Sequence, residues 1–194
     1  KLEFTHNEWE EFIDAASETK DIWLDIFDDF GIQVLRDNLK KVYGIKLQVS
    51  VLFNRNVLEQ LKYIDLRTKK VIINVAGLEL HTIKSFARFF NTELTIEELL
   101  FEVGFQGYPT QLVDSGISKI RELKAVFGNR IVFADHISGT DPDSVYLPIT
   151  AFMLGADVIE KHVMLGVRKT EYDSYSSLTP SVFDTFFKKL NEYS

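Results

Sequence analysis

The stretch Val158-Ile159-Glu160-Lys161-His162 is an apolar run that ends abruptly in an acid, a base and an imidazole. Side chains alternate between the two faces of a strand, so a strand here places Val158, Glu160 and His162 on one face. Burying Glu160 and His162 beside an apolar residue is costly unless a partner pairs with them. A bound metal ion or an anionic substrate would be such a partner. The alternative is that the strand has ended and that Glu160 and Lys161 are solvated.

Composition excludes several classes of protein. At 194 residues the chain is long enough for one domain with a substantial core. It contains no Cys, which excludes a disulfide framework and thiolate chemistry. The net charge is −7, with acids and bases interspersed, so neither a nucleic-acid footprint nor a polybasic membrane anchor is indicated. No apolar run reaches the length of about 18 residues that a membrane span needs. We expect a cytoplasmic protein with no nucleic-acid or membrane partner.

Six short apolar runs alternate with helical patterns along the chain. The runs cover residues 22–27, 45–51, 71–75, 100–103, 130–136 and 158–162. Helical spacing covers residues 8–16, 32–39, 58–64, 83–90, 117–127, 145–154 and 180–190, while 94–99 is expected to add a helical turn or loop. The strands and helices alternate at intervals of roughly 25 to 30 residues. Such alternation favours βαβ units and a parallel sheet with right-handed connections.

Polar residues gather where the last two runs end. Chemistry in a parallel α/β protein collects at the carboxyl ends of its strands. His136 ends the fifth run and His162 ends the sixth. If these strands are neighbours, about 4.8 Å apart, the two imidazoles could share a divalent ion. Imidazole with carboxylate and water suits Mn, Zn or Fe rather than Ca. The alternative is two unrelated histidines, each hydrogen-bonded at a strand end.

The second run has a polar face, and several common motifs are absent. Strict alternation over residues 45–51 predicts that Lys46, Gln48 and Ser50 share one face of a strand. The chain has no GxGxxG after a strand and no GxxxxGK[ST], so neither dinucleotide nor P-loop phosphate chemistry is supported. A GxSxG nucleophile motif is also absent.

The chain resembles the sialic acid synthase family, including its legionaminic, pseudaminic and spore-coat polysaccharide synthase-like members. The resemblance lies in Ala134-Asp135-His136 with Gly139, followed by Leu154-Gly155-Ala156-Asp157-Val158-Ile159-Glu160-Lys161-His162. The family shows a Ser-Asp-His strand end, a helix and then an LGAxVIEKH strand. Weaker similarities lie in Tyr172-Asp173, Ser177-Leu178-Thr179-Pro180 and Gln106-Gly107-Tyr108-Pro109-Thr110. The similarity is collinear over essentially the whole chain.

The resemblance implies a fold and a reaction. Members of the family are TIM barrels that condense phosphoenolpyruvate with an N-acylated hexosamine to give nonulosonic acids. It therefore implies an α/β, TIM-barrel-like parallel barrel, incomplete, with about six βα units and the first two units missing. Residues 1–194 would form one partial domain, without the antifreeze-like domain that follows in the family. We expect a homodimer or a part of a longer polypeptide, because an open parallel edge must be covered.

The resemblance also implies roles for individual residues. His136 and His162 would hold a divalent ion, Mn or Mg. Substrate would be bound by Lys46, Asn74, Gln106 and Tyr108. Catalysis would involve Asp173 and Glu160, with Asp173 on the sugar or metal side.

Departures from the family pattern favour a second hypothesis. Ala134 stands where the family has Ser, which removes a phosphate donor. The family's catalytic Glu falls near Ser50 or Val51, where this chain offers no carboxylate. One hypothesis is therefore a phosphoenolpyruvate-dependent, C–C bond-forming transferase. The second is a non-catalytic binding or regulatory domain derived from one, and the third is a different metal-dependent lyase or aldolase that uses the same histidines.

Overall fold

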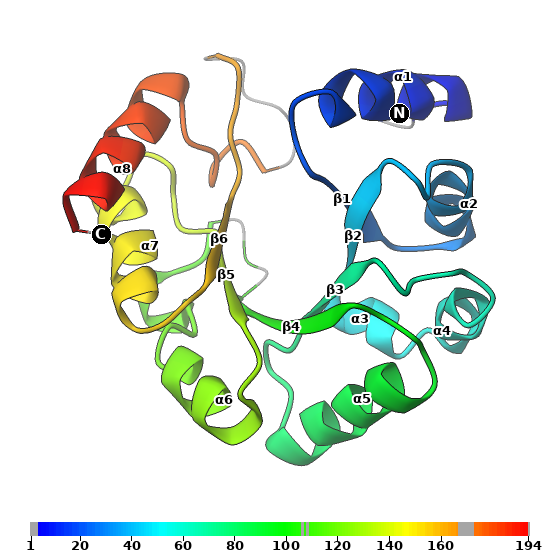
Figure 1. Ribbon diagram of the computed structural model, residues 1–194. Helices are drawn as coiled ribbons and strands as arrows, with labels where there is room; N and C mark the ends of the chain where they lie inside the picture. Colours follow the sequence, from blue (N-terminus) through cyan, green and yellow to red (C-terminus); the bar gives the residue numbers. More distant parts are fainter. Residues whose placement is uncertain (1–3, 106, 108, 167–172, 194) are drawn as a thin grey trace. The chain divides into compact units, whose positions relative to one another are not determined.

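The computed structural model describes residues 4–105, 107, 109–166 and 173–193 (Figure 1). It divides into two compact units, Lys1–Leu100 and Phe101–Ser194. The first unit contains α1 (His6–Ser17), β1 (Ile22–Ile26), α2 (Asp29–Asp37), β2 (Val42–Leu47), α3 (Val49–Leu52), α4 (Arg55–Leu61), β3 (Lys70–Asn74) and α5 (Leu80–Thr92). After β4 (Glu98–Val103), the second contains the 3₁₀ helix η1 (Leu112–Asp114), α6 (Lys119–Phe127), β5 (Ile131–Asp135), α7 (Asp143–Met153), β6 (Val158–Lys161) and α8 (Pro180–Tyr193).

The strands follow one another in chain order, from β1 to β6. The described pairings, β1–β2, β2–β3, β4–β5 and β5–β6, are all parallel. One or more helices follow each strand, which makes six βα units. Parallel strands in chain order with a helix after each are the arrangement of a TIM-barrel-like fold. The predicted α/β fold class is confirmed.

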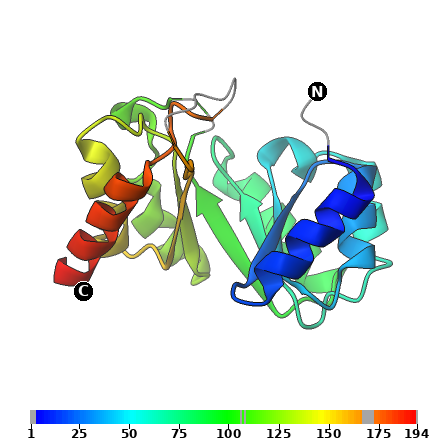
Figure 2. The ribbon, with the colours of Figure 1, turned by 90° about the horizontal axis from the view of Figure 1, so that it is seen from above.

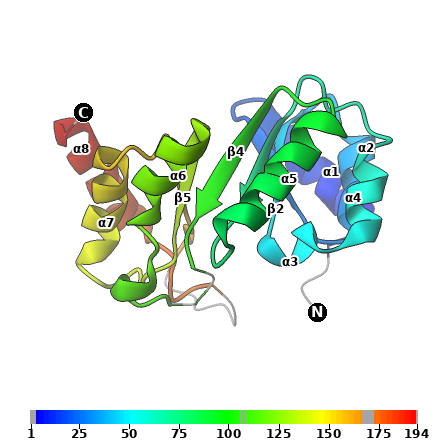
Figure 3. The ribbon, with the colours of Figure 1, turned by 90° about the horizontal axis from the view of Figure 1, so that it is seen from below.

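The first unit packs helices against β1, β2 and β3. Its core includes fully buried side chains from strands and helices alike, such as Ile45, Ile73, Leu35 and Phe90. Helices α2 and α4 lie side by side (Figure 3). Helix α1 begins with a capping box, in which the Thr5 side chain accepts from the Glu8 N–H and the Glu8 carboxylate accepts from the Thr5 N–H.

The second strand differs from the prediction. It covers Val42–Leu47 instead of residues 45–51. The strand starts before the alternating pattern does, and Gly44 lies inside it. Gly44 lies opposite Trp23, and a Cβ at Gly44 would lie 2.4 Å from the Trp23 ring. After Leu47 the chain turns into α3, so Ser50 lies in a helix and does not extend the polar face of the strand. Residues 98 and 99, expected in a turn or loop, belong to β4.

The second unit packs α7 and α8 together. They lie side by side (Figure 2) and share an apolar cluster that contains Val145, Ile149, Leu178 and Phe186. Gly128 ends α6 in the left-handed conformation, at φ 72°, which glycine adopts readily at a helix end. The helix predicted over residues 145–154 begins earlier, at Asp143, so Pro148 lies inside α7 and not in its first turn. Within the described part of the chain, no helix has both the length and the apolar character to cross a bilayer.

Candidate functional site

The carboxyl ends of β5 and β6 bring two histidines together. Ala134 lies opposite Glu160 in the parallel register, and His136 and His162 directly follow the two strands. Their ring centroids are 5.2 Å apart, with the ring planes tilted by 47°. His136 is buried and His162 is half-buried. The two imidazoles therefore lie beside each other, in the place where the strand pairing predicted them.

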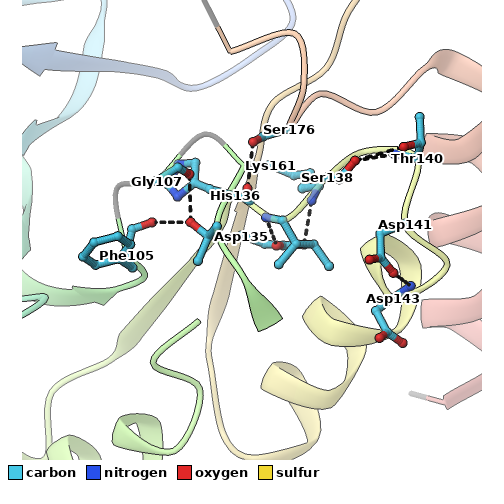
Figure 4. A network of polar contacts seen from close by, with 12 residues as sticks. Phe105, Gly107, Asp135, His136, Ser138, Thr140, Asp141, Asp143, Lys161 and Ser176 are labelled. Atoms are coloured by element: carbon cyan, nitrogen blue, oxygen red, sulfur yellow. Dashed lines mark hydrogen bonds and ion pairs between the residues drawn. The ribbon is translucent and has the colours of Figure 1, made fainter. Parts of the chain in front are cut away.

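A buried ion pair occupies the same strand ends. Asp135 lies opposite Lys161, and the Lys161 Nζ is 2.7 Å from the Asp135 Oδ2. The Asp135 side chain is 0% exposed and the Lys161 side chain is 3% exposed. Figure 4 labels both residues at the strand ends. Burial raises the pKa of the Asp135 carboxyl and lowers the pKa of the Lys161 ammonium, and the attraction between the two charges opposes both shifts. The alternative in which Lys161 is solvated is therefore wrong, and Glu160 is half-buried.

Residues 173–178, here called the strap, hold the backbone of both histidines. The Ser176 hydroxyl donates to the His136 carbonyl at 2.7 Å (Figure 4), and the Leu178 N–H donates to the His162 carbonyl at 2.8 Å. The Thr110 N–H also donates to the His136 carbonyl, at 2.8 Å. Neither histidine can shift along its strand without breaking at least one of these hydrogen bonds.

The strap is shaped by Asp173 and Gly139. Asp173 has a positive φ of 59°, and its carbonyl accepts from the Ser176 N–H and the Ser177 hydroxyl at 3.0 and 2.9 Å. The Gly139 N–H donates to the Tyr175 carbonyl at 2.7 Å. A Cβ at Gly139 would lie 2.0 Å from the Ser177 carbonyl oxygen, so this position has no room for a side chain. Asp173 thus fixes the path of the strap through its own backbone.

Two imidazoles are what the described residues offer to a metal ion. Among them, no group of three or more His, Asp or Glu side chains is placed to hold one. The ring centroids, 5.2 Å apart, are at a separation that two imidazoles bound to one ion can have, with Zn–N or similar bonds of about 2.1 Å. The remaining coordination positions would be left to water or substrate, as in catalytic sites. Nitrogen ligands suit Mn better than Mg, which prefers oxygen ligands.

The other predicted site residues in described regions lie in the first unit. Lys46 is buried in β2 with its Nζ 3.8 Å from the Asp25 Oδ2, and Asp25 also accepts from the Gln48 amide at 2.7 Å. Asn74 ends β3 on the face that carries Lys46, fully buried, and its Oδ1 accepts from the Ala76 N–H at 2.9 Å.

Sequence reasoning missed Asp25, although an acid inside the apolar run 22–27 was a visible signal. It also missed that the strap holds the backbone of both histidines, although Asp173 within the strap was predicted as a site residue. Two predicted substrate-binding residues, Gln106 and Tyr108, lie outside the described residues.

Comparisons with known proteins agree on one family. The model of the NeuB family matches residues 1–194. The chain is 28% identical to the pseudaminic acid synthase of Helicobacter pylori over 131 residues, which are 65% of this chain and 36% of that protein. The N-acetylneuraminic acid synthetase of Leptospira borgpetersenii superposes with a TM-score of 0.83 and 20% identity, covering 98% of this chain and 63% of that chain.

A spore coat polysaccharide biosynthesis protein of Bacillus subtilis is similar in the same way. It superposes with a TM-score of 0.82 and 22% identity, covering 98% of this chain and 51% of that chain. At such identities these structures show the fold alone. The chain spans less than two thirds of the length of each of these three proteins.

Proposed function

The chain belongs to the NeuB family, and on this premise we propose that it is a synthase-like domain for a nonulosonic acid. Its substrates would be phosphoenolpyruvate and an N-acylated hexosamine, a sugar class suggested by the pseudaminic acid synthase relative. The observation that carries the proposal is the pair of imidazoles, 5.2 Å apart, at the carboxyl ends of two adjacent parallel strands. Barrels of this type hold their active sites at those ends.

The reaction would join carbon 3 of phosphoenolpyruvate to the aldehyde carbon of the open-chain sugar, while water adds to carbon 2 and phosphate leaves. A divalent ion, when bound, would supply Lewis acidity to the sugar carbonyl. His136 and His162 would each present one ring nitrogen to it. Glu160 and Asp173 would contact the sugar side of the site and handle protons there. These roles are proposals from the family pattern combined with the strand-end geometry.

Lys46 is proposed to bind the phosphoenolpyruvate anion. Its side chain is only 7% exposed, and a buried ammonium is costly unless negative charge lies nearby. Asp25 at 3.8 Å provides part of that charge. A substrate phosphate or carboxylate would add more, and a compact ammonium suits this as a point charge. Asn74 would donate or accept beside it on the same sheet face.

A non-catalytic binding domain is the second candidate, and one observation favours it. The positions where the family's catalytic Glu is expected lie in α3, where Ser50 is exposed and Val51 is buried and apolar. Neither residue can serve as a general acid or base. In addition, Ala134 contributes only a buried methyl group at the strand end. Such a domain would keep the ion and anion sites without turnover.

Calorimetry and a phosphate-release assay test the proposal together. Mn²⁺ and phosphoenolpyruvate are titrated into the chain, and phosphate release is then measured with N-acetylmannosamine and other N-acylated hexosamines. We expect Mn²⁺ binding that is lost in His136→Ala and in His162→Ala. The matched control is His81→Ala, because His81 lies exposed in the first unit.

The outcomes separate the candidates. Phosphate release that depends on Mn²⁺ and a hexosamine supports the synthase. Binding of Mn²⁺ and phosphoenolpyruvate without release by any hexosamine leaves the binding domain. If the parent chain binds no Mn²⁺, or if His81→Ala loses binding as fully as the other two variants, the proposed histidine site is wrong.

A further inference from the structure

We propose that Asp135 and Lys161 are a positioning pair, which holds the carboxyl ends of β5 and β6 so that His136 and His162 face each other. The inference deepens the proposed function and rests on it. It assigns to two buried residues a role toward the histidine site that does not require them to touch an ion or a substrate.

The pair lies where the paired part of the two strands stops. Asp135 opposite Lys161 is the last pair of the parallel register. Each residue directly precedes one of the two histidines. Because side chains alternate, the ion pair lies on one face of the sheet and the imidazoles on the other. A change in the separation or twist of the strand ends would therefore move both imidazoles.

Asp135 restrains the chain on both sides of His136. Its Oδ2 accepts from the Lys161 Nζ across the strands at 2.7 Å. Its Oδ1 accepts from the Ile137 N–H at 3.0 Å, one residue beyond the histidine. The peptide groups that flank His136 are thus tied to β6 and to the turn that follows. A buried carboxylate that accepts two hydrogen bonds has little freedom to rotate.

The amino ends of the same strands are tied in another way. There the Asp157 N–H donates to the Ile131 carbonyl, and the Asp157 Oδ2 accepts from the Ile131 N–H, both at 2.8 Å. Lys124 pairs with Asp157 at 3.0 Å, but these side chains are 41% and 26% exposed. An exposed ion pair forms with little loss of hydration. A fully buried ion pair adds little net stability, because the cost of desolvating both charges offsets their attraction. Among the described residues of β5 and β6, the buried pair lies at the end that carries the histidines and an exposed pair lies at the other end, which fits a geometric role.

The test variant is Asp135→Asn/Lys161→Met. The amide oxygen of Asn keeps an acceptor for the Ile137 N–H, and Met fills the volume of the Lys stem, so only the cross-strand link is removed. The matched control is Lys124→Met/Asp157→Asn, which removes the ion pair at the amino ends and keeps an acceptor for the Ile131 N–H. Thermal unfolding and circular dichroism confirm that both proteins are folded before either readout.

The first readout needs no metal. With ¹³C-labelled histidine, the parent and the control should show a nuclear Overhauser effect between the ring protons of His136 and His162. In the test variant this signal should fall by at least about half, because the strand ends are no longer linked. The second readout is calorimetry with Mn²⁺, for which we expect an affinity about tenfold weaker than that of the parent, as is typical when an outer-shell partner is lost.

An unchanged ring–ring signal in the folded test variant would overturn the inference, whether or not the protein binds Mn²⁺. An equal loss of that signal in the control would also overturn it, because the effect would then be a general loosening of the unit. If the parent binds no Mn²⁺ but the ring–ring signal falls only in the test variant, the proposed function fails while the positioning role stands.

Discussion

Removing the lysine of the buried ion pair should destabilise the protein strongly. In Lys161→Met the Asp135 carboxylate, which is 0% exposed, loses its charged partner. Breaking a buried pair by removing one member costs about 3–5 kcal/mol, since the remaining charge stays desolvated. The double variant Asp135→Asn/Lys161→Met removes that charge. We therefore expect the single variant to be less stable than the double variant at pH 7, by about 3 kcal/mol.

The stability difference between the single and double variants should depend on pH. Burial already raises the pKa of Asp135, and loss of Lys161 removes the attraction that opposes the rise. When the pKa of a carboxyl is higher in the folded state than its unfolded value of about 3.9, the protein is most stable at low pH, where the carboxyl is protonated. The protein then loses stability as the pH rises through the folded pKa. The gap between the single and double variants should therefore close as the pH falls from about 8 towards about 4.

Urea unfolding of both variants across that pH range measures the difference in their free energies of unfolding. The two proteins share all other titrating groups, so the effects of those groups cancel in the difference. Lys124→Met serves as the control, because removing one member of an exposed pair should change stability by less than about 1 kcal/mol. Equal stability of the single and double variants at pH 7 would refute the reasoning. A gap of constant size at every pH would refute it too, since it would not arise from the Asp135 charge.

Three further changes test other parts of the structure. Gly139→Ala should lower the free energy of unfolding, measured in urea, by about 1–3 kcal/mol, because the added methyl group would overlap the Ser177 backbone of the strap. A stability equal to that of the parent would show that the strap can move away from residue 139 at no cost. Thr5→Ala should cost about 1 kcal/mol through loss of the α1 cap, and Thr5→Ser should restore most of it. The hydrogen bonds from Arg67 lower the pKa of Asp65 to about 2, so its stabilising effect is fully present above its unfolded pKa of about 3.9 and is lost as pH falls from there through the folded pKa. The stability difference between the parent and Asp65→Asn should accordingly shrink between about pH 5 and pH 2, and a difference that grows would contradict the assignment.

The apolar runs predicted the strands well because parallel strands are buried on both faces. Each of the six runs overlaps a strand, and most ends agree within one or two residues. The second strand was displaced because the strict alternation starts only at Ile45, while the strand starts at Val42 and includes Gly44, which allows the close approach of Trp23. The alternation of residues 45–51 continued into α3, where it has no structural meaning, because a helix this short leaves no periodic signal of its own.

The candidate site was predictable where two strands that follow each other in the sequence are also neighbours in the sheet. The parity of positions along the fifth and sixth strands was enough to place His136 and His162 at matching ends. The burial of Lys161 was not predictable from residues 158–162, because its partner Asp135 lies 26 residues earlier and faces it only through the strand pairing. The role of the strap was missed for the same reason, since its hydrogen bonds join atoms that are far apart in sequence.

The central claim is that His136 and His162 hold one divalent ion together. Pulsed electron paramagnetic resonance of bound Mn²⁺ measures this directly, because each coordinating imidazole nitrogen gives a ¹⁴N coupling. We expect two such couplings in the parent chain and in His81→Ala, and loss of the coupled Mn²⁺ signal in His136→Ala and in His162→Ala. A spectrum of bound Mn²⁺ with no ¹⁴N coupling, or one that is unchanged in the two variants, would contradict it.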